Sequence, residues 1–392
     1  MKLLSDLFTP SSSILDTRIS KSLIDMTTGV INGSPLMLTA MGRKSGALTS
    51  GIEKHSIKRA DRLLGNKKLH DKRAHFYQNI ASFFATIANP LIHVDWSTYY
   101  NYNFLILRAS ISVSGRAITI YEEVHPEEKQ NNDLVHRNFL KKLKSILPTE
   151  ATPIICTDAG YKVPWFKAVE DLEWYYLARS RGEVYCQLAT GGEWNKTHSY
   201  HKQATGKATE LPNILLSKTH SHACRAVLFK GKDMQRKKKN RKGATTLDST
   251  NIKHSKSAKE PWFLVSNLPA EKFKAMHFVN LYKRRMGIEE GFRDCKNEYY
   301  GMGLKRSRSK CKERLQIILL IAMLALFYLI TLGKSAEMKG YHLDFQANTV
   351  KDKRVLSYTY LGRRVMQNAR YELNEDQLIC AFIELIEETK YA

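Results

Sequence analysis

The hydrophobic pattern along the middle of the chain switches between two periods, and this switching predicts a mixed α/β fold. Short runs rich in apolar and β-branched residues predict strands, and stretches whose apolar residues recur every three or four positions predict helices. From residue 91 onward these patterns predict strand, strand, strand, helix, strand, helix and strand. The predicted elements are 91–96, 104–113, 117–124, 131–147, 153–157, 164–174 and 174–181.

Two carboxylates stand at the ends of predicted strands. Asp95 closes the strand at 91–96, and Asp158 directly follows the strand at 153–157. Taken singly, each aspartate is more often a cap or turn residue than a catalytic one. Combined with the order of strands and helices, the two positions are the layout of a ribonuclease-H-like catalytic core.

The regions around this core have a different composition. Residues 182–260 are rich in Gly, Ser, Thr and Lys and hold strand-like runs at 183–188 and 223–229, which predicts a mainly β insertion domain. An apolar strand returns at 262–267, and a long helix is expected from Glu271. The predicted division is a helical region at 1–88, the first part of the core at 89–181, the β-rich insertion at 182–260, the second part of the core at 261–310 and a helical region at 311–392.

The most apolar run is IILLIAMLALFYLI at residues 317–330. It falls short of the roughly 18 residues expected of a membrane span. A buried core helix at 314–332 is therefore the better interpretation, with no membrane partner.

The charge balance points to a polyanionic partner. Lys and Arg exceed Asp and Glu by 24, which suits nucleic acid or an anionic membrane surface. The basic and apolar residues of 52–88 suit a helix-turn-helix-like DNA-binding unit, or equally a solvated basic helix bundle. The basic run at 230–242 is typical of a solvated loop that could also bind phosphates nonspecifically.

Cysteine usage suggests a reducing cytoplasm. None of the six cysteines forms a CxxC pair, so neither a disulfide framework nor a zinc ribbon is indicated. His220, His222 and Cys224 alternate as on a strand, but without a fourth ligand they are a weak metal signal. The opening MKLLSDLFTPSSS breaks its apolar run early and is not typical of a signal peptide.

The stretch YKRRMGIEEGFRDCK at 282–296 carries the strongest chemical signal. If it is one helix, Tyr282, Arg285, Glu289 and Lys296 lie at roughly 0°, −60°, −20° and −40° on the helical wheel. They then share one narrow stripe. Such a stripe is either a surface salt-bridge ladder or a metal-binding carboxylate flanked by cations that bind a phosphate backbone.

The spacing Tyr-x2-Arg-x3-Glu-x6-Lys resembles the signature of the YREK group of bacterial DDE transposases, the cut-and-paste enzymes of insertion sequences. HVDWS around Asp95, TDAGYKVPWFK around Asp158, AKEPWFLVSNLP around Trp262 and FQANTV at 345–350 resemble the transposon-ten type. The resemblance spans about residues 50–365. Two departures are visible: Met286 stands where some relatives carry tryptophan, and Tyr161 replaces the usual phenylalanine after Asp-Ala-Gly.

The resemblance implies a catalytic triad of Asp95, Asp158 and Glu289. Three such carboxylates suit Mg²⁺, with Mn²⁺ as a substitute, in a two-metal arrangement that needs no covalent protein nucleophile. It also implies phosphate contacts from Tyr282, Arg285 and Lys296, and stacking of Trp262 on a base flipped from a terminal DNA hairpin. The implied partners are double-stranded DNA with terminal inverted repeats, bound by the N-terminal region, target DNA, and a second copy of the chain in a synaptic complex in the nucleoid.

Two other functions fit parts of the pattern. A nuclease with the same core would cut DNA without joining it, but the stripe at 282–296 suits an enzyme that holds a specific end for joining. A noncatalytic DNA-binding repressor would explain the basic charge, but it would not need all three carboxylates.

Overall fold

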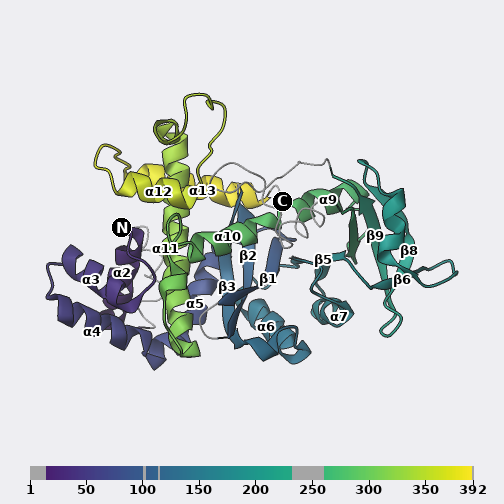
Figure 1. The fold of residues 1–392 in the computed structure, drawn as a ribbon, viewed down its shortest axis with the longest axis horizontal. Helices are drawn as coiled ribbons and strands as arrows, with labels where there is room; N and C mark the ends of the chain where they lie inside the picture. The colour runs from purple at the N-terminus through teal and green to yellow at the C-terminus, as the bar shows by residue number, and fades with distance from the viewer. Residues whose placement is uncertain (1–14, 100–102, 114, 232–259, 391–392) are drawn as a thin grey trace, which may run out of the picture. The chain divides into compact units, whose positions relative to one another are not determined.

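The structure is a computed structural model that describes residues 15–99, 103–113, 115–231 and 260–390. The chain forms two compact units (Figure 1). The first unit combines Met1–Pro153 with Arg285–Ala392, and the second is Ile154–Arg284. The mixed α/β class expected from the sequence is confirmed by the helices and strands of both units.

The sheet of the first unit is an antiparallel meander of β1 (Leu91–Tyr99), β2 (Phe104–Val113) and β3 (Arg116–Pro126). All three strands were predicted, but β1 is longer than expected. Ser97, Thr98 and Tyr99 continue the pairing with β2, so Asp95 lies inside the strand, opposite Arg108, and not at its end. Helix α6 (Asp133–Ile146) follows, with Asn132 as its N-cap.

Helix α11 (Lys312–Met338) is the core of the first unit (Figure 1). It packs against β3 and against helices from both ends of the chain. The flanking helices are α2 (Thr17–Ile31), α4 (Glu53–Leu64), α5 (Lys67–Phe84), α12 (Tyr358–Met366) and α13 (Glu375–Lys390).

The buried helix expected at 314–332 is therefore confirmed, although it extends further at both ends. Within the described ranges, α11 is the one helix long and apolar enough to cross a membrane, and its most apolar 18-residue window is 100% buried. A helix that is apolar on all sides is either a core helix or a membrane span. Its burial among helices and a strand of the same unit identifies a core helix.

The N-terminal part of the first unit is helical, as expected. Helix α3 (Leu38–Leu48) completes the series α2 to α5. Asp16 caps α2 by accepting from Arg18 N, and Asn66 caps α5 by accepting from Leu69 N. Residues 1–14, for which the sequence predicts no signal peptide, lie outside the described residues.

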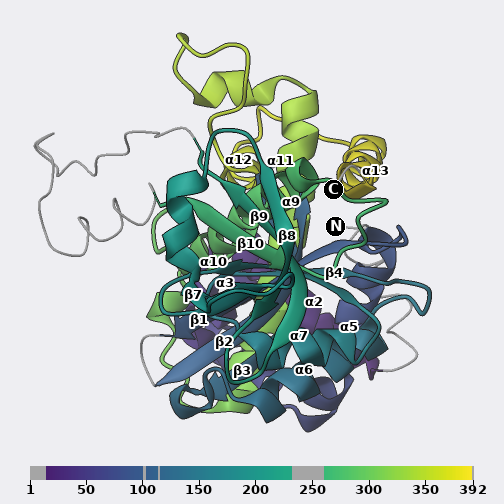
Figure 2. The same cartoon turned by 90° about the vertical axis from the view of Figure 1, so that its right-hand side faces the viewer.

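The second unit is built on one sheet. Its strands lie in the order β4-β5-β10-β9-β8-β6-β7, and Figure 2 shows β8, β9 and β10 side by side. β4 is parallel to β5, and β10 is antiparallel to both β5 and β9. The strands are β4 (Ile154–Thr157), β5 (Tyr175–Ser180), β6 (Tyr185–Leu188), β7 (Asn195–Lys196), β8 (Thr209–Leu216), β9 (His222–Phe229) and β10 (Trp262–Ser266).

Five of these strands were predicted, whereas β7 and β8 were not. The sequence of β8 is TELPNILL, and its polar first half and Pro212 obscure the alternating pattern of a strand. Its pairing with β9 shifts register between Leu211 and Ile214. Helix α7 (Val163–Glu170) was predicted at 164–174, so the observed helix starts and ends earlier than expected. Most of the basic run at 230–242 lies outside the described residues.

The prediction of one long helix from Glu271 through Lys296 is wrong. The chain forms α9 (Ala275–Lys283) and α10 (Met286–Lys296), separated at Arg284 and Arg285. Arg284 N bonds to Leu281 O and Ile288 N to Arg285 O, three residues back and not four. These tighter turns interrupt the α-helical ladder, and the boundary between the two units falls at the same point.

The described residues also form four short 3₁₀ helices. They are Glu127–Lys129, Thr197–Gln203, Leu304–Arg306 and Tyr341–Phe345.

Candidate active site

In the first unit, two of the expected catalytic carboxylates share one arginine. Arg285 Nη1 lies 3.6 Å from Asp95 Oδ2, and Arg285 Nη2 donates to Glu289 Oε1. Asp95 comes from β1, Arg285 is the N-cap residue of α10, and Glu289 lies in the first turn of α10. The fold therefore brings together two acidic residues that are 194 positions apart (289 − 95).

This grouping is more than an exposed salt-bridge ladder. The Arg285 and Asp95 side chains are only 13% and 17% exposed, whereas Glu289 is 42% exposed. The two carboxylates face one guanidinium, and the ammonium of Lys296 on the same helix also interacts with Asp95. The grouping is therefore a largely buried set of acidic residues that are paired with cations.

Lys296 lies on the same face of α10 as Glu289, seven residues on, because seven steps of about 100° return the helix to within about 20°. Its ammonium donates to Ser97 Oγ at 2.6 Å and to Thr98 O at 2.5 Å, which ties the end of α10 to β1. Burial, together with the nearby Arg108 and Lys305, lowers the pKa of Lys296 to about 8.

In the second unit, Asp158 follows the last residue of β4, as predicted. Its Oδ1 accepts a hydrogen bond from Gly160 N at 2.8 Å, which fixes the turn after the strand. Lys162 donates to Ala159 O at 2.8 Å. Burial lowers the pKa of Lys162, and the charge of Asp158 opposes that shift.

The second unit also brings Trp262 and Tyr282 together. Trp262 begins β10 and Tyr282 lies near the end of α9. Their rings meet edge to face, with centroids 5.0 Å apart, and Phe229 lies 5.8 Å from Trp262 on the adjoining strand. Trp262 is partly exposed, while Tyr282 is buried.

The expected stripe of four residues on one helix is therefore not present, because the helix ends before Arg284. Asp95, Arg285, Glu289 and Lys296 belong to the first unit, and Asp158, Trp262 and Tyr282 to the second. In the described part of the chain, no group of three or more His, Cys, Asp or Glu side chains is placed to hold a metal ion. The complete triad and its metal stay a prediction.

Comparison with protein families identifies the chain. Residues 107–327, more than half of the 392, match the transposase DDE domain. This chain belongs to the DDE transposase family. The matched segment includes Asp158 and Glu289 but begins after Asp95, so the family match does not extend to the first carboxylate.

Two further comparisons are less informative about this DDE transposase. Curated proteins give no significant match. Among solved structures, the "Cryo-EM structure of piggyBac transposase synaptic complex with hairpin DNA" is similar at 8% identity and a TM-score of 0.43, over 97% of this chain and 75% of that one. The family membership rests on the domain match alone.

The sequence patterns missed a buried ion pair close to the candidate site. Arg108 of β2 lies opposite Glu122 of β3, and its Nε and Nη2 donate to Glu122 Oε2 at 2.9 and 2.7 Å. The guanidinium also lies 4.3 Å from the centre of the Phe292 ring on α10. One signal was visible: Arg108 is the one charged residue in the strand sequence FLILRASISV.

The weak metal signal at residues 220–224 has a structural explanation. His222 Nε2 is 3.0 Å from the hydroxyl of Tyr176, and Glu170 lies 3.6 Å from the same nitrogen. Burial lowers the pKa of His222 and raises that of Cys224 to about 12. Both residues are buried on one side of β9.

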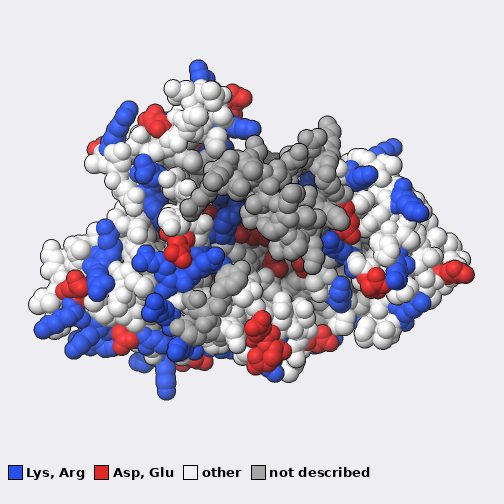
Figure 3. Space-filling model, in the orientation of Figure 1, with Lys and Arg blue, Asp and Glu red and all other residues white. Residues whose placement is uncertain are grey.

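Basic residues gather over the N-terminal helices of the first unit. Figure 3 shows Lys and Arg side chains concentrated over α3 and α4. Beside them is a cavity of about 1000 Å³, which Met37, Leu38 and Leu64 line on the helical side. Its other wall is strongly basic: Lys305, Arg306, Arg308, Lys310 and Arg314.

Proposed function

We propose that this transposase is a cut-and-paste enzyme of the YREK group, with a ribonuclease-H-like core. It binds terminal inverted repeats, excises the element by hydrolysis and hairpin formation, and joins the 3′ ends to target DNA in the nucleoid. The observation that carries the proposal is the convergence of Asp95, Arg285 and Glu289 in a chain of the DDE transposase family.

A divalent metal would be held by the carboxylates of the proposed triad. Asp95 and Glu289 offer hard oxygen donors of the kind that Mg²⁺ and Mn²⁺ prefer, and a cationic group already lies between them. Asp158 would supply the third carboxylate. The chemistry that such a site supplies when loaded is activation of a water or 3′-hydroxyl and stabilisation of the leaving oxygen.

The remaining site residues would hold DNA. Arg285 can bind a phosphate through two parallel hydrogen bonds, and its partly buried position beside the carboxylates would place that phosphate at the reacting centre. Trp262 has an exposed portion on which an unpaired base can stack, and Tyr282 supports its edge. The basic side chains that line the cavity beside α3 and α4 would contact the phosphate backbone of the transposon end.

A strand-transfer assay tests the proposal. The full chain is incubated with Mg²⁺, a labelled duplex that carries one transposon end, and target plasmid. We expect a nicked end, a hairpin and a joined product. Cleavage without joined product would favour a nuclease, and end binding without cleavage in either Mg²⁺ or Mn²⁺ would favour a repressor; each result overturns the proposal.

Arg285 and Lys296 should respond differently to substitution. Arg285→Lys should lose more end-complex formation than Lys296→Arg, because only arginine offers a bidentate grip. Arg285→Ala and Lys296→Ala should each lower the salt slope of end binding by about one unit. Electrophoretic mobility shifts at several salt concentrations measure both effects.

Arg293→Ala is the matched control, because it removes one positive charge from the same helix at a side chain that is 64% exposed. Its salt slope should change by less than half a unit. If Arg285→Ala behaves like Arg293→Ala and loses only the few tenths of a kcal/mol typical of an exposed pair, Arg285 has no phosphate-binding role.

A further inference from the structure

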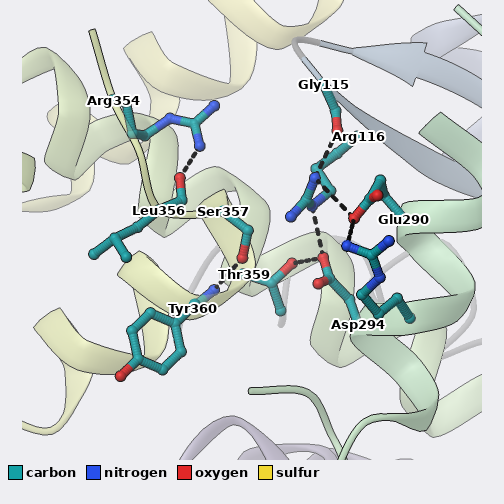
Figure 4. Close-up of polar contacts among 10 residues, drawn as sticks. Gly115, Arg116, Glu290, Asp294, Arg354, Leu356, Ser357, Thr359 and Tyr360 are labelled. Atoms are coloured by element: carbon teal, nitrogen blue, oxygen red, sulfur yellow. Dashed lines mark hydrogen bonds and ion pairs between the residues drawn. The ribbon is translucent and has the colours of Figure 1, made fainter. Parts of the chain in front are cut away.

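A third acidic residue of α10, Asp294, is buried on the side away from the candidate site. It is 6% exposed, and its Oδ2 accepts hydrogen bonds from Arg116 Nε at 2.9 Å and from Thr359 Oγ1 at 2.8 Å. Figure 4 shows these side chains converging on the one carboxylate. We call Asp294, Arg116 and Thr359 the Asp294 cluster.

The cluster joins three separate elements of the first unit. Arg116 is the first residue of β3, and Thr359 lies in the first turn of α12. The start of α12 is itself fixed, because Ser357 caps it by accepting from Tyr360 N at 3.0 Å. Arg116 also donates to Gly115 O at 2.7 Å (Figure 4). The carboxylate of Asp294 therefore has two well-anchored donors.

Helix geometry links the Asp294 cluster to Glu289. Five residues at about 100° each place Asp294 roughly 140° around the helix from Glu289, so the two carboxylates lie on nearly opposite sides of α10. Gly287 and Gly291 lie on the Asp294 side. A Cβ at Gly287 would stand 2.9 Å from Arg116 O, and one at Gly291 would stand 3.6 Å from Ala117 O.

The glycine contacts allow α10 to approach the start of β3 closely, but apolar contact alone leaves a helix able to slide or rotate. Hydrogen bonds are directional, and the two donors reach Asp294 from different elements. Burial raises the pKa of Asp294, and Arg116 and Thr359 oppose that shift. A buried carboxylate is costly unless it is paired, so the pairing strongly favours one placement of the helix.

We propose that Asp294 is a positioning residue, which through Arg116 and Thr359 fixes the rotation and height of α10 and so sets where Glu289 presents its carboxylate. The inference rests on the proposed function, in which Glu289 is a metal ligand. The effect of Asp294 is exerted through the helix, because the residue faces away from Asp95 and Glu289.

The test compares Asp294→Asn, Asp294→Ala and Thr359→Val in the full chain. Thr359→Val keeps the shape of the side chain and removes a single donor, so it separates positioning from loss of folding. Three quantities are measured: Mn²⁺ affinity by electron paramagnetic resonance, cleavage rate on a pre-bound DNA end, and the Kd for that end. Amide exchange of residues 286–296 reports on the helix itself.

We expect the cleavage rate to fall about tenfold for Asp294→Ala and less for Asp294→Asn and Thr359→Val. Mn²⁺ affinity should weaken in the same order and exchange in α10 should quicken, while the Kd for DNA changes less than about twofold. Parent-like cleavage and Mn²⁺ affinity in both Asp294→Asn and Thr359→Val would overturn the proposal. Equal losses of DNA binding, cleavage and thermal stability would assign the cluster to general stability, and would also overturn it.

A failure of the proposed catalytic function would give a different set of results from a failure of the positioning role. If Glu289→Gln retains parent cleavage, Glu289 is not a metal ligand and the proposed chemistry fails, whatever the Asp294 variants do. If Glu289→Gln abolishes cleavage and the Asp294 variants match the parent, only the positioning role fails.

Discussion

Asp95→Asn, Asp158→Asn and Glu289→Gln should each reduce DNA cleavage and joining by at least about 10³-fold, while binding to the transposon end survives. Each change keeps the size of the side chain and removes the negative charge that a divalent ion needs. The DNA contacts proposed for Arg285, Trp262 and the basic cavity come from other side chains. Cleavage rates on pre-bound ends and mobility shifts with the same duplex separate the two effects.

Glu298→Gln provides the control, because Glu298 is an exposed carboxylate just beyond the end of α10. It should cleave within about twofold of the parent. Residues that act as one catalytic unit are strongly non-additive, so the double variant Asp95→Asn with Glu289→Gln should be no slower than either single one. A single variant that keeps cleavage within about tenfold of the parent is not a metal ligand.

Much of the fold could be predicted because its strands and helices are amphipathic or wholly apolar. β1 to β5, α6 and α11 follow directly from period and apolar content. The errors fall where tertiary contacts override local pattern. The break at Arg284 contains neither Pro nor Gly, so nothing in the sequence marks it, and it coincides with the passage from one compact unit to the other.

The candidate site was only partly visible in the sequence. Spacing correctly placed Glu289 and Lys296 on one face of α10, but it could not show that Asp95 and Glu289 share Arg285. The Asp294 cluster was missed because Arg116 and Asp294 are 178 positions apart in the chain. A local pattern carries no information about such pairs. In the sequence, Asp294 cannot be distinguished from the other charged residues of an amphipathic helix.

The crossing of α11 and α12 depends on two glycines. A Cβ on Gly333 of α11 would stand 2.1 Å from Tyr358 O, and one on Gly362 of α12 would stand 2.3 Å from Leu329 O. Real Cβ atoms essentially never come closer than 3.0 Å to such atoms. The obstructing atoms belong to helix backbones, which cannot rotate away as a side chain can, so any added methyl group must push the two helices apart.

Gly333→Ala should therefore lower the free energy of unfolding of the first unit by about 3 kcal/mol, the upper range for overpacking, despite the roughly 1 kcal/mol by which alanine favours a helix over glycine. For a unit of this size, the loss corresponds to a fall in Tm of about 6–12 °C. Thermal unfolding followed by circular dichroism measures it.

Gly29→Ala is the matched control, because Gly29 also lies inside a helix but the nearest atom to its Cβ, Met41 O, would be 3.4 Å away, an ordinary contact. It should leave Tm unchanged or raise it slightly. The Gly333 variant should also slow cleavage, because Tyr358 directly precedes Thr359, whose hydroxyl reaches Asp294 on α10. An unchanged Tm for Gly333→Ala would mean that α11 and α12 can separate at little cost. The crossing of α11 and α12 could then not hold Thr359 in place. The packing of α11 on α12 would therefore not influence the position of Glu289 on α10.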